Sequence, residues 1–566
     1  MIPELAGFIS FQNAPSEITG GTDSVLFRPE ATFTNQQGPI RLYSFKLSGV
    51  LRQNWLADLN LGMWQIPPGA GSTPASGYAT SASQNRKDGN VWYDNNRQGI
   101  SNSSGRDLGG VSTAYFIGDV LGSHQLKAGF DTDRTSFLNS TALTGTPSDP
   151  SFCPGTPGRT CGAYFWFNGF DAAGARIPFR QFVNESSDSA PTGKSYAAYV
   201  QDQWSPIRNL TVNLGLRWDE SKYYSRSGPN FLNLVKLQPR LAASWDVRGD
   251  GKNRLSAAWG TFYTDPGLIV AVLSDFGFTP PVSRTYQWSA TAGAWKILSQ
   301  TGGAYAAQPR VDSPLAPTYV EQVNVAYQRE IVRGLSGTAT YVYKKTHDLF
   351  DNTCSGQPDC STVWLSNQPG ASFGVTDALQ ANYFAWMFAL DYRSARLQAY
   401  FSYVYSKSQG SVDQVNQYQG GDFDWYPDNF VNRYGYLNDD ARNRFKLYGA
   451  WRIPLVETTL SFAYNYQSGV PYTVTQASPG GHGDKYVEPR GTDRTAVLNN
   501  LDLQFMKAIR VRSRLSVTPI FSIFNVFSQE QPTRYGTTVE SPATLRQPIA
   551  WNSPRSYQIG VRVDWY

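Results

Sequence analysis

Long apolar runs are absent from this sequence of 566 residues, and so are the motifs of the common enzyme classes. A membrane-spanning helix needs about 18 consecutive apolar residues, so the sequence excludes transmembrane helices. No GxSxG, HExxH, phosphate-binding loop or dinucleotide fingerprint occurs, and only three histidines are scattered along the chain (His124, His347 and His482). We therefore expect neither catalysis nor a bound cofactor.

Charge is sparse and evenly spread. The net charge is +5, and the basic residues form no cluster, which argues against a nucleic-acid-binding surface. No linker rich in Pro, Gly or Ser and no charge block divides the sequence. We expect residues 1–566 to form one domain.

A secretion signal is not recognisable at the start. Residues 1–10 (MIPELAGFIS) have no basic stretch followed by an apolar run. Because the features below require export, we expect this sequence to be the downstream part of a longer precursor, or its start to have been assigned too late.

Cysteine is rare, and the four cysteines form two close pairs. Cys153 and Cys161 lie in CPGTPGRTC, and Cys354 and Cys360 lie in CSGQPDC. Their spacing is not that of CxxC metal sites, and no histidine accompanies them. We expect two loop disulfides, formed in an oxidising compartment outside the cytoplasm.

Alternation of apolar and polar residues is the strongest positive signal. Residues 554–566 (PRSYQIGVRVDWY) place Tyr557, Ile559, Val561, Val563 and Trp565 on one side of an extended chain. The same period of two recurs in residues 210–219 (LTVNLGLRWD), 397–406 and 460–467. These segments predict strands with one apolar and one polar face.

Aromatic residues make up 14% of the chain, with 33 Tyr, 31 Phe and 16 Trp. Tyr and Trp favour the bilayer interface, where one end of the ring is apolar and the other end is wet. Since closed barrels are the spanning structures that remain once helices are excluded, the sequence predicts an all-β fold, a transmembrane antiparallel β-barrel. A soluble sandwich or propeller does not explain the terminal strand.

The predicted strands are joined by connections that are alternately short and long. Short ones lie at residues 121–123, 205–209, 247–253, 331–334, 393–395, 454–456 and 509–512, and long ones near 66–109, 138–193, 265–318, 348–381, 408–441, 469–498 and 528–553. Short turns mark the periplasmic side and long loops the extracellular side. With further strands near 24–34, 40–50 and 55–65, the total is about 18 strands, an even and closable number.

Several segments resemble one family. The segments are residues 195–219 (SYAAYVQDQWSPIRNLTVNLGLRWD), 237–263, 319–349, 401–407 (FSYVYSK), 439–454 (DDARNRFKLYGAWRIP) and 516–527 (SVTPIFSIFNVF). In this order they resemble the hairpins of Oar-like TonB-dependent outer-membrane receptors. The resemblance implies a barrel of about 22 strands, a plug inside its lumen, and energised uptake of a bulky nutrient.

This sequence departs from that family plan in three ways. The predicted strand count is about four lower, and we find no plug, TonB box or signal peptide. Contact with the TonB complex would therefore depend on a missing N-terminal region. The alternation ends at Trp565, and Tyr566 is out of register. We expect these two residues to serve as the terminal aromatic signal that the barrel-assembly machinery reads.

One loop concentrates acidic and aromatic side chains. Residues 420–436 (GGDFDWYPDNFVNRYGY) contain the candidate ligand-binding residues Asp422, Asp424, Trp425, Tyr426, Asp428 and Tyr434. The simpler interpretation is a loop that packs on its neighbours with its carboxylates in solvent. Calcium is a further alternative for the three aspartates, but their spacing is not that of an EF-hand, so no metal site is predicted.

The sequence thus predicts the barrel of a TonB-dependent receptor in the outer membrane of a bacterium with two membranes. It would contact outer-membrane lipid and take up an unknown extracellular ligand, such as a siderophore, a glycan or a peptide. The alternative is a barrel without a plug that acts as a passive pore or as a structural or adhesive scaffold.

Overall fold

The computed structural model describes residues 4–21, 27–118, 120–225, 230–268, 281–301, 310–311, 314–355, 362–371, 374–375, 379–412, 427–477 and 484–565. Nearly all regular structure within these ranges is β-strand. The exceptions are three short 3-10 helices, η1 (Pro29–Ala31), η2 (Pro150–Phe152) and η4 (Pro427–Phe430). The all-β prediction is confirmed.

One antiparallel sheet of 21 strands dominates the described chain. Three of its strands are short segments, β10 (Ser187–Ser189), β24 (Gly435–Tyr436) and β32 (Ile509–Arg512), which leaves 18 long strands. In sheet order these are β1 (Glu4–Gly21), β2 (Phe33–Arg52), β3 (Trp55–Pro74), β6 (Gln98–Ile117), β7 (Ser123–Leu143), β11 (Thr192–Ile207), β12 (Leu210–Tyr224), β13 (Asn230–Asp246), β14 (Asn253–Tyr263), β18 (Tyr319–Val332), β19 (Leu335–His347), β22 (Ala381–Arg393), β23 (Leu397–Gly410), β25 (Asn443–Ile453), β26 (Thr458–Gln467), β31 (Leu498–Met506), β33 (Leu515–Phe524) and β36 (Ser556–Trp565).

The period-two pattern of the sequence becomes the two faces of this sheet. In β12, Arg217 is opposite Gln238 of β13, while the next residue, Trp218, is opposite Leu237. Paired residues project to the same face, so polar and apolar rows alternate along the strands. The apolar face carries large exposed side chains, among them Val200, Leu214, Leu216, Leu237 and Leu241. An exposed apolar surface of this extent requires an apolar surrounding.

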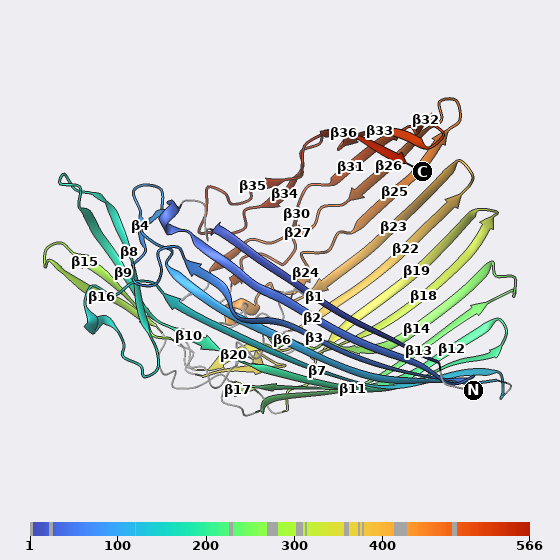
Figure 1. The fold of residues 1–566 in the computed structure, drawn as a ribbon, viewed down its shortest axis with the longest axis horizontal. Coiled ribbons are helices and arrows are strands. Elements are labelled where there is room, and N and C mark those ends of the chain that lie inside the picture. The colour runs from blue at the N-terminus through green and yellow to red at the C-terminus, as the bar shows by residue number, and fades with distance from the viewer. Residues whose placement is uncertain are drawn as a thin grey trace.

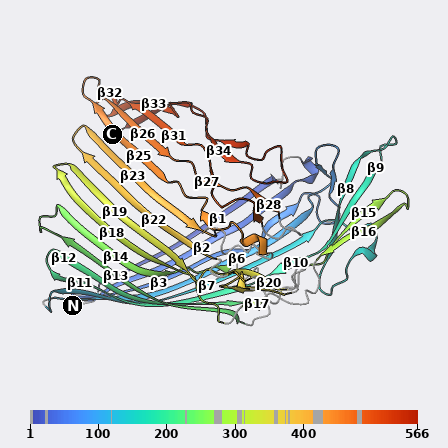
Figure 2. The ribbon, with the colours of Figure 1, turned by 180° about the vertical axis from the view of Figure 1, so that it is seen from behind.

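The short connections gather at one end of the sheet and the long ones at the other, and both chain ends lie on the short-turn side (Figures 1 and 2). The tightest turns are two residues long, as at residues 333–334, where Gly334 has φ +84°. An added Cβ on Gly334 would lie 2.5 Å from the carbonyl oxygen of Arg393, so the position requires glycine.

Three sequence predictions about the strands and their connections were wrong. The first strand is β1, and η1 occupies part of the segment predicted as a strand at 24–34. Apolar residues fall on both faces of β1, for example Phe8 and Ile9, so its alternation is hidden. Residues 509–512 are the strand β32 rather than a turn. The link between β12 and β13 spans only residues 225–229, so the short and long connections do not alternate strictly.

The sheet is open. Within the described residues no ladder joins β1 to β36, and the views show a curved trough whose first and last strands are separate (Figures 1 and 2). Both edge strands are unusually exposed, with Ile9 at 78% and Ile559 at 81%. The count of 18 long strands agrees with the prediction, but the closure of the barrel is not present.

The long connections form smaller sheets of their own. The largest has six strands in the order β16 (Ala294–Thr301), β15 (Ser283–Ser289), β9 (Arg176–Glu185), β8 (Cys161–Phe170), β4 (Ser83–Asn85) and β5 (Val91–Tyr93), and it projects beyond the trough (Figure 1). The others are β17 (Arg310–Val311) with β21 (Thr362–Ser366) and β20 (Asp351–Ser355), β27 (Pro471–Tyr472) with β30 (Asp493–Arg494), β28 (Thr475–Ala477) with β29 (Asp484–Tyr486), and β34 (Pro532–Tyr535) with β35 (Pro548–Trp551).

Candidate functional site

The predicted ligand-binding loop is only partly described. Asp422, Asp424, Trp425 and Tyr426 lie outside the described residues. Asp428, in η4, accepts a hydrogen bond from Lys485 Nζ at 2.8 Å and leaves 63% of its side chain exposed. Tyr434 is 51% exposed. Both described members therefore lie at the surface of the loop layer, where a ligand can reach them.

A buried carboxylate lies beneath this loop. The side chain of Asp440 is fully buried and forms ion pairs with Arg494 at 2.5 Å and Arg442 at 3.2 Å. It also accepts a hydrogen bond from the backbone N–H of Ser408 at 2.7 Å. The guanidinium groups of Arg442 and Arg494 lie over the ring of Tyr436, at 4.6 and 5.3 Å from its centroid respectively. Charge-assisted bonds of this kind hold separate loop segments together.

Two neighbouring arginines extend this support. Arg433 Nε and Arg490 Nη1 both donate to the carbonyl oxygen of Ser411, at 2.9 and 2.7 Å. In the adjoining loop, Arg546 bonds to Glu488 and Asp493. The loops that follow β23, β26 and β33 are thereby joined into one layer. None of these residues was predicted, because the contacts that join one loop to another connect residues far apart in the chain, as with Asp440 and Arg494, which are 54 residues apart.

The polar face of the trough carries paired charges. Arg217 lies on this face and bonds to Asp219 at 2.9 Å and to Asp131 at 3.4 Å. Arg106 pairs with Asp133 at 2.5 Å on the neighbouring strands. A wall of alternating charges suits a hydrated interior rather than a packed core.

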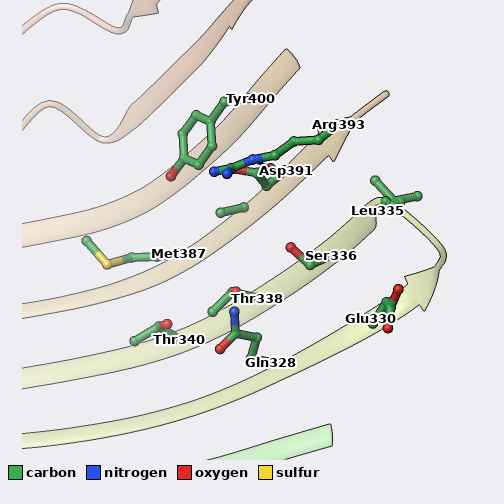
Figure 3. Close-up of a pocket in the computed structure, with 12 residues that line it drawn as sticks. Gln328, Glu330, Leu335, Ser336, Thr338, Thr340, Met387, Asp391, Arg393 and Tyr400 are labelled. Carbon is green, nitrogen blue, oxygen red and sulfur yellow. Dashed lines mark hydrogen bonds and ion pairs between the residues drawn. The ribbon is translucent and has the colours of Figure 1, made fainter. Parts of the chain in front are cut away.

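A cavity of about 690 Å³ opens on the same face near the short turns. Figure 3 shows its lining side chains projecting from four consecutive strands, β18, β19, β22 and β23. Arg393 donates to Asp391 at 2.8 Å at its rim. The labelled lining residues are Gln328, Glu330, Leu335, Ser336, Thr338, Thr340, Met387, Asp391, Arg393 and Tyr400.

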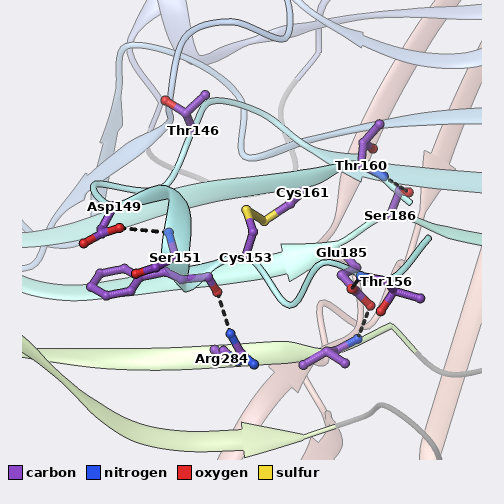
Figure 4. Close-up of a disulfide and its surroundings, with 12 residues drawn as sticks. Thr146, Asp149, Ser151, Cys153, Thr156, Thr160, Cys161, Glu185, Ser186 and Arg284 are labelled. Atoms are coloured by element: carbon purple, nitrogen blue, oxygen red, sulfur yellow. Dashed lines mark hydrogen bonds between the residues drawn. A yellow bond between two sulfur atoms is a disulfide. The ribbon is translucent and has the colours of Figure 1, made fainter. Parts of the chain in front are cut away.

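The first predicted disulfide is present. Cys153 and Cys161 are bonded, with their Cα atoms 6.0 Å apart (Figure 4). Beside it, Glu185 accepts hydrogen bonds from the backbone N–H groups of Thr156 at 3.1 Å and Val282 at 3.0 Å. The pair of Cys354 and Cys360 lies outside the residues whose side chains are described, so that prediction stays open.

Of the two residues predicted as the assembly signal, Trp565 lies at the edge of the sheet. Trp565 ends β36, is opposite Leu515 and is 75% exposed. Tyr566 is outside the described residues.

Two further searches concern only the described part of the chain. It contains no group of three or more His, Cys, Asp or Glu residues that could hold a metal ion. In these same ranges no helix is long and apolar enough to cross a membrane.

Comparison with known families identifies the class of protein. The model of the family described as "Outer membrane beta barrel domain" matches residues 8–236 and 227–556. The chain therefore belongs to this family, and its location is the bacterial outer membrane.

Within this class, the chain is similar to the TonB-dependent transporter Oar of Myxococcus xanthus. The two are 23% identical over 506 residues, which cover 78% of this chain and 45% of Oar. The chain thus spans less than half the length of this curated relative. The resemblance proposed from the hairpin segments is confirmed.

Solved structures show the same fold. The outer membrane transporter YddB from Escherichia coli superposes with a TM-score of 0.64 and 11% identity, covering 100% of this chain and 67% of YddB. FpvA of P. aeruginosa, bound to heterologous pyoverdines, gives 0.54 and 9% over 100% of this chain and 62% of FpvA. The ferric citrate transporter FecA gives 0.52 and 11% over 95% of this chain and 62% of FecA. YddB and FecA are named as transporters.

Proposed function

We propose that this chain is the barrel of a TonB-dependent receptor that takes up a bulky nutrient, such as a siderophore, a glycan or a peptide. The observation that carries the proposal is the similarity to the TonB-dependent transporter Oar along 78% of the chain. The polar face with its paired charges and the extracellular loop layer supply the two parts such a receptor needs, a hydrated path and a binding surface.

In this proposal the ligand binds to the outer loop layer. Asp428 and Tyr434 are accessible there, and Asp422, Asp424, Trp425 and Tyr426 belong to the same loop. Aromatic rings and carboxylates together suit sugars, peptides and ligands with a positive charge. The ligand would then pass along the polar face, past a plug supplied by a region outside this sequence and coupled through that region to TonB.

Assembly would depend on the last strand. The exposed apolar face of β36, with Tyr557, Ile559 and Trp565, would be read by the barrel-assembly machinery, with Trp565 and Tyr566 as its terminal residues. The competing function is a passive pore or a surface scaffold, and it draws on the open cavity on the polar face.

Energy dependence separates the receptor from the pore. We expect cells that carry the full-length natural gene to accumulate one member of a labelled panel of iron chelates, oligosaccharides and peptides, and to stop when the proton gradient is dissipated. Uptake that continues without the gradient would establish the pore. If no panel compound enters or binds while the protein is present in the outer membrane, the scaffold is the better account.

The binding loop is tested by Tyr434→Ala combined with Asp428→Ala. We expect at least about tenfold weaker binding of the transported compound, because an aromatic contact and a charged contact are both removed. Tyr78→Ala is the matched control, since Tyr78 is 49% exposed in a different loop. Equal losses in the two variants would contradict the assignment of the 420–436 loop.

A further inference from the structure

Three basic residues stand directly opposite one another on adjacent strands of the large sheet. Arg134 of β7 is opposite Lys194 of β11, and Lys194 is opposite Lys222 of β12. Tyr196 lies two residues from Lys194 on β11, and Trp218 lies four residues from Lys222 on β12. Both spacings are even, so both aromatic side chains project to the same side of the sheet as this row. The row therefore lies on the apolar, lipid-facing side of the sheet and not on the polar side that carries Arg217.

The charges of this row are incompletely neutralised. Lys222 pairs with Glu220 at 2.9 Å. Lys194 lies 4.9 Å from the ring centroid of Tyr224, and neither Lys194 nor Arg134 forms an ion pair with any described residue. Asp107 is opposite Arg134 on β6 but does not reach ion-pair distance. Like charges directly opposite each other destabilise a sheet, so an anion at this row would relieve a built-in repulsion.

The position of the row along the strands matches the edge of a lipid leaflet. On the side of the short turns, the apolar face continues with Phe130 on β7, Ala198 and Val200 on β11, and Leu216 and Trp218 on β12. Tyr196 and Trp218 lie between the apolar residues and the cations, where interfacial aromatics are found. On the other side β7 and β11 border the long connection between Leu143 and Thr192, and β12 ends at Tyr224, two residues beyond Lys222. The cations thus lie at the extracellular border of the apolar band.

We propose that Arg134, Lys194 and Lys222 bind the anionic headgroup of a phosphorylated glycolipid in the outer leaflet, with its acyl chains on the apolar residues beside them. A lipid is the occupant that supplies both parts, since a phosphate meets the cations and a hydrocarbon chain meets Phe130, Val200 and Leu216. Basic residues bordering a membrane surface attract anionic lipids in this way. The proposal needs only the location in the outer membrane and is independent of which nutrient is transported.

The test measures lipid retention by the purified full-length protein in detergent, by native mass spectrometry with three probes. These are a bis-phosphorylated glycolipid, the same lipid after enzymatic removal of its phosphates, and inorganic phosphate. We expect the phosphorylated lipid to be retained at least about tenfold better than the dephosphorylated one. Equal retention of both lipids would overturn the proposal. Displacement of the lipid by inorganic phosphate at equal concentration would show a free-phosphate site instead.

The variant arm uses Arg134→Gln with Lys194→Gln. Each surface cation contributes about 1 kcal/mol to the attraction, so we expect roughly 30-fold weaker retention of the phosphorylated lipid and no change for the dephosphorylated one. Lys46→Gln is the matched control, because Lys46 is an exposed lysine opposite Asn60 on the polar face of the sheet. Unchanged retention in the double variant would contradict the assignment of these residues, and the comparison of lipids on the natural protein holds even if the variant fails to fold.

Discussion

At the scale of single residues, the layer beneath the candidate ligand loop depends on one carboxylate. Asp440 is fully buried, while Arg442 and Arg494 keep 23% and 29% of their side chains exposed. Removing a buried partner leaves charges that water cannot fully solvate, which costs far more than losing a surface ion pair. The position of Tyr434 and its neighbours thus depends on a residue that no ligand would touch.

We expect Asp440→Asn to destabilise this loop layer by about 3 kcal/mol, near the lower end for a broken buried pair because both guanidinium groups remain partly hydrated. Hydrogen exchange should rise at residues 437–442 and 490–495 and stay unchanged in the long strands. Asp428→Asn removes a mostly exposed ion pair with Lys485. It should change the free energy of local opening measured by exchange by less than about 1 kcal/mol. Similar effects of the two substitutions would contradict the conclusion that Asp440 holds the loop layer together.

At the scale of elements, the six-stranded sheet is attached through the end of β9. Glu185 has a side chain that is only 2% exposed, and it joins the loop of the Cys153–Cys161 disulfide to the backbone before β15 through Thr156 and Val282 (Figure 4). Burial alone would raise the pKa of Glu185. The hydrogen bonds from Thr156 and Val282, with the nearby Arg159, outweigh burial and hold the pKa below its ordinary value.

This lowered pKa predicts an acid-sensitive attachment. Because the folded pKa lies below the unfolded value of about 4.3, the stabilisation is complete above pH 4.3 and is lost as the pH falls through the folded pKa. We expect the amides of Thr156 and Val282, corrected for intrinsic rates, to lose protection below about pH 4. Glu185→Gln should lose that protection at neutral pH and show no further change with acid. Glu30→Gln, at an exposed position in η1, is the control, and an unchanged acid profile in Glu185→Gln would contradict the assignment.

At the scale of the whole molecule, the edge strands β1 and β36 of the described sheet each leave one row of backbone hydrogen-bonding groups unpaired. In lipid, each unpaired backbone group costs several kcal/mol. β1 and β36 lie at opposite ends of an antiparallel order with an even number of long strands, so they run in opposite directions. They can pair with each other, or an even number of additional strands can lie between them.

We expect both edges to be covered in the membrane. In the open sheet, alternate amides of residues 4–14 point away from β2, and these should exchange as slowly as the inward ones when the protein is in lipid. Fast exchange at alternate positions would show that the edge stays open. Cysteine pairs between Ile9 and Ile559, Val561 or Val563, which all lie on the apolar face, then decide how the edge is covered, because they crosslink only if the two strands meet directly.

The sequence and the structure agree most closely where information is local. Residues 210–219, 397–406 and 460–467 were predicted as strands and lie within β12, β23 and β26, because a period of two needs only neighbouring residues to be recognised. The predictions failed at β1, where both faces are apolar, and at β32, where a strand was taken for a turn. The ligand loop stays a prediction, since only Asp428 and Tyr434 fall within the described residues.

The sequence by itself determined the all-β class, the two faces of the strands, most short turns and the Cys153–Cys161 disulfide. Each follows from residues close together in the chain. Only the tertiary structure decided that the long connections build a six-stranded sheet, that Asp440 binds Arg494 from another loop, and that Arg134, Lys194 and Lys222 form one row. These features depend on strand register, which brings distant residues together and which no local pattern encodes.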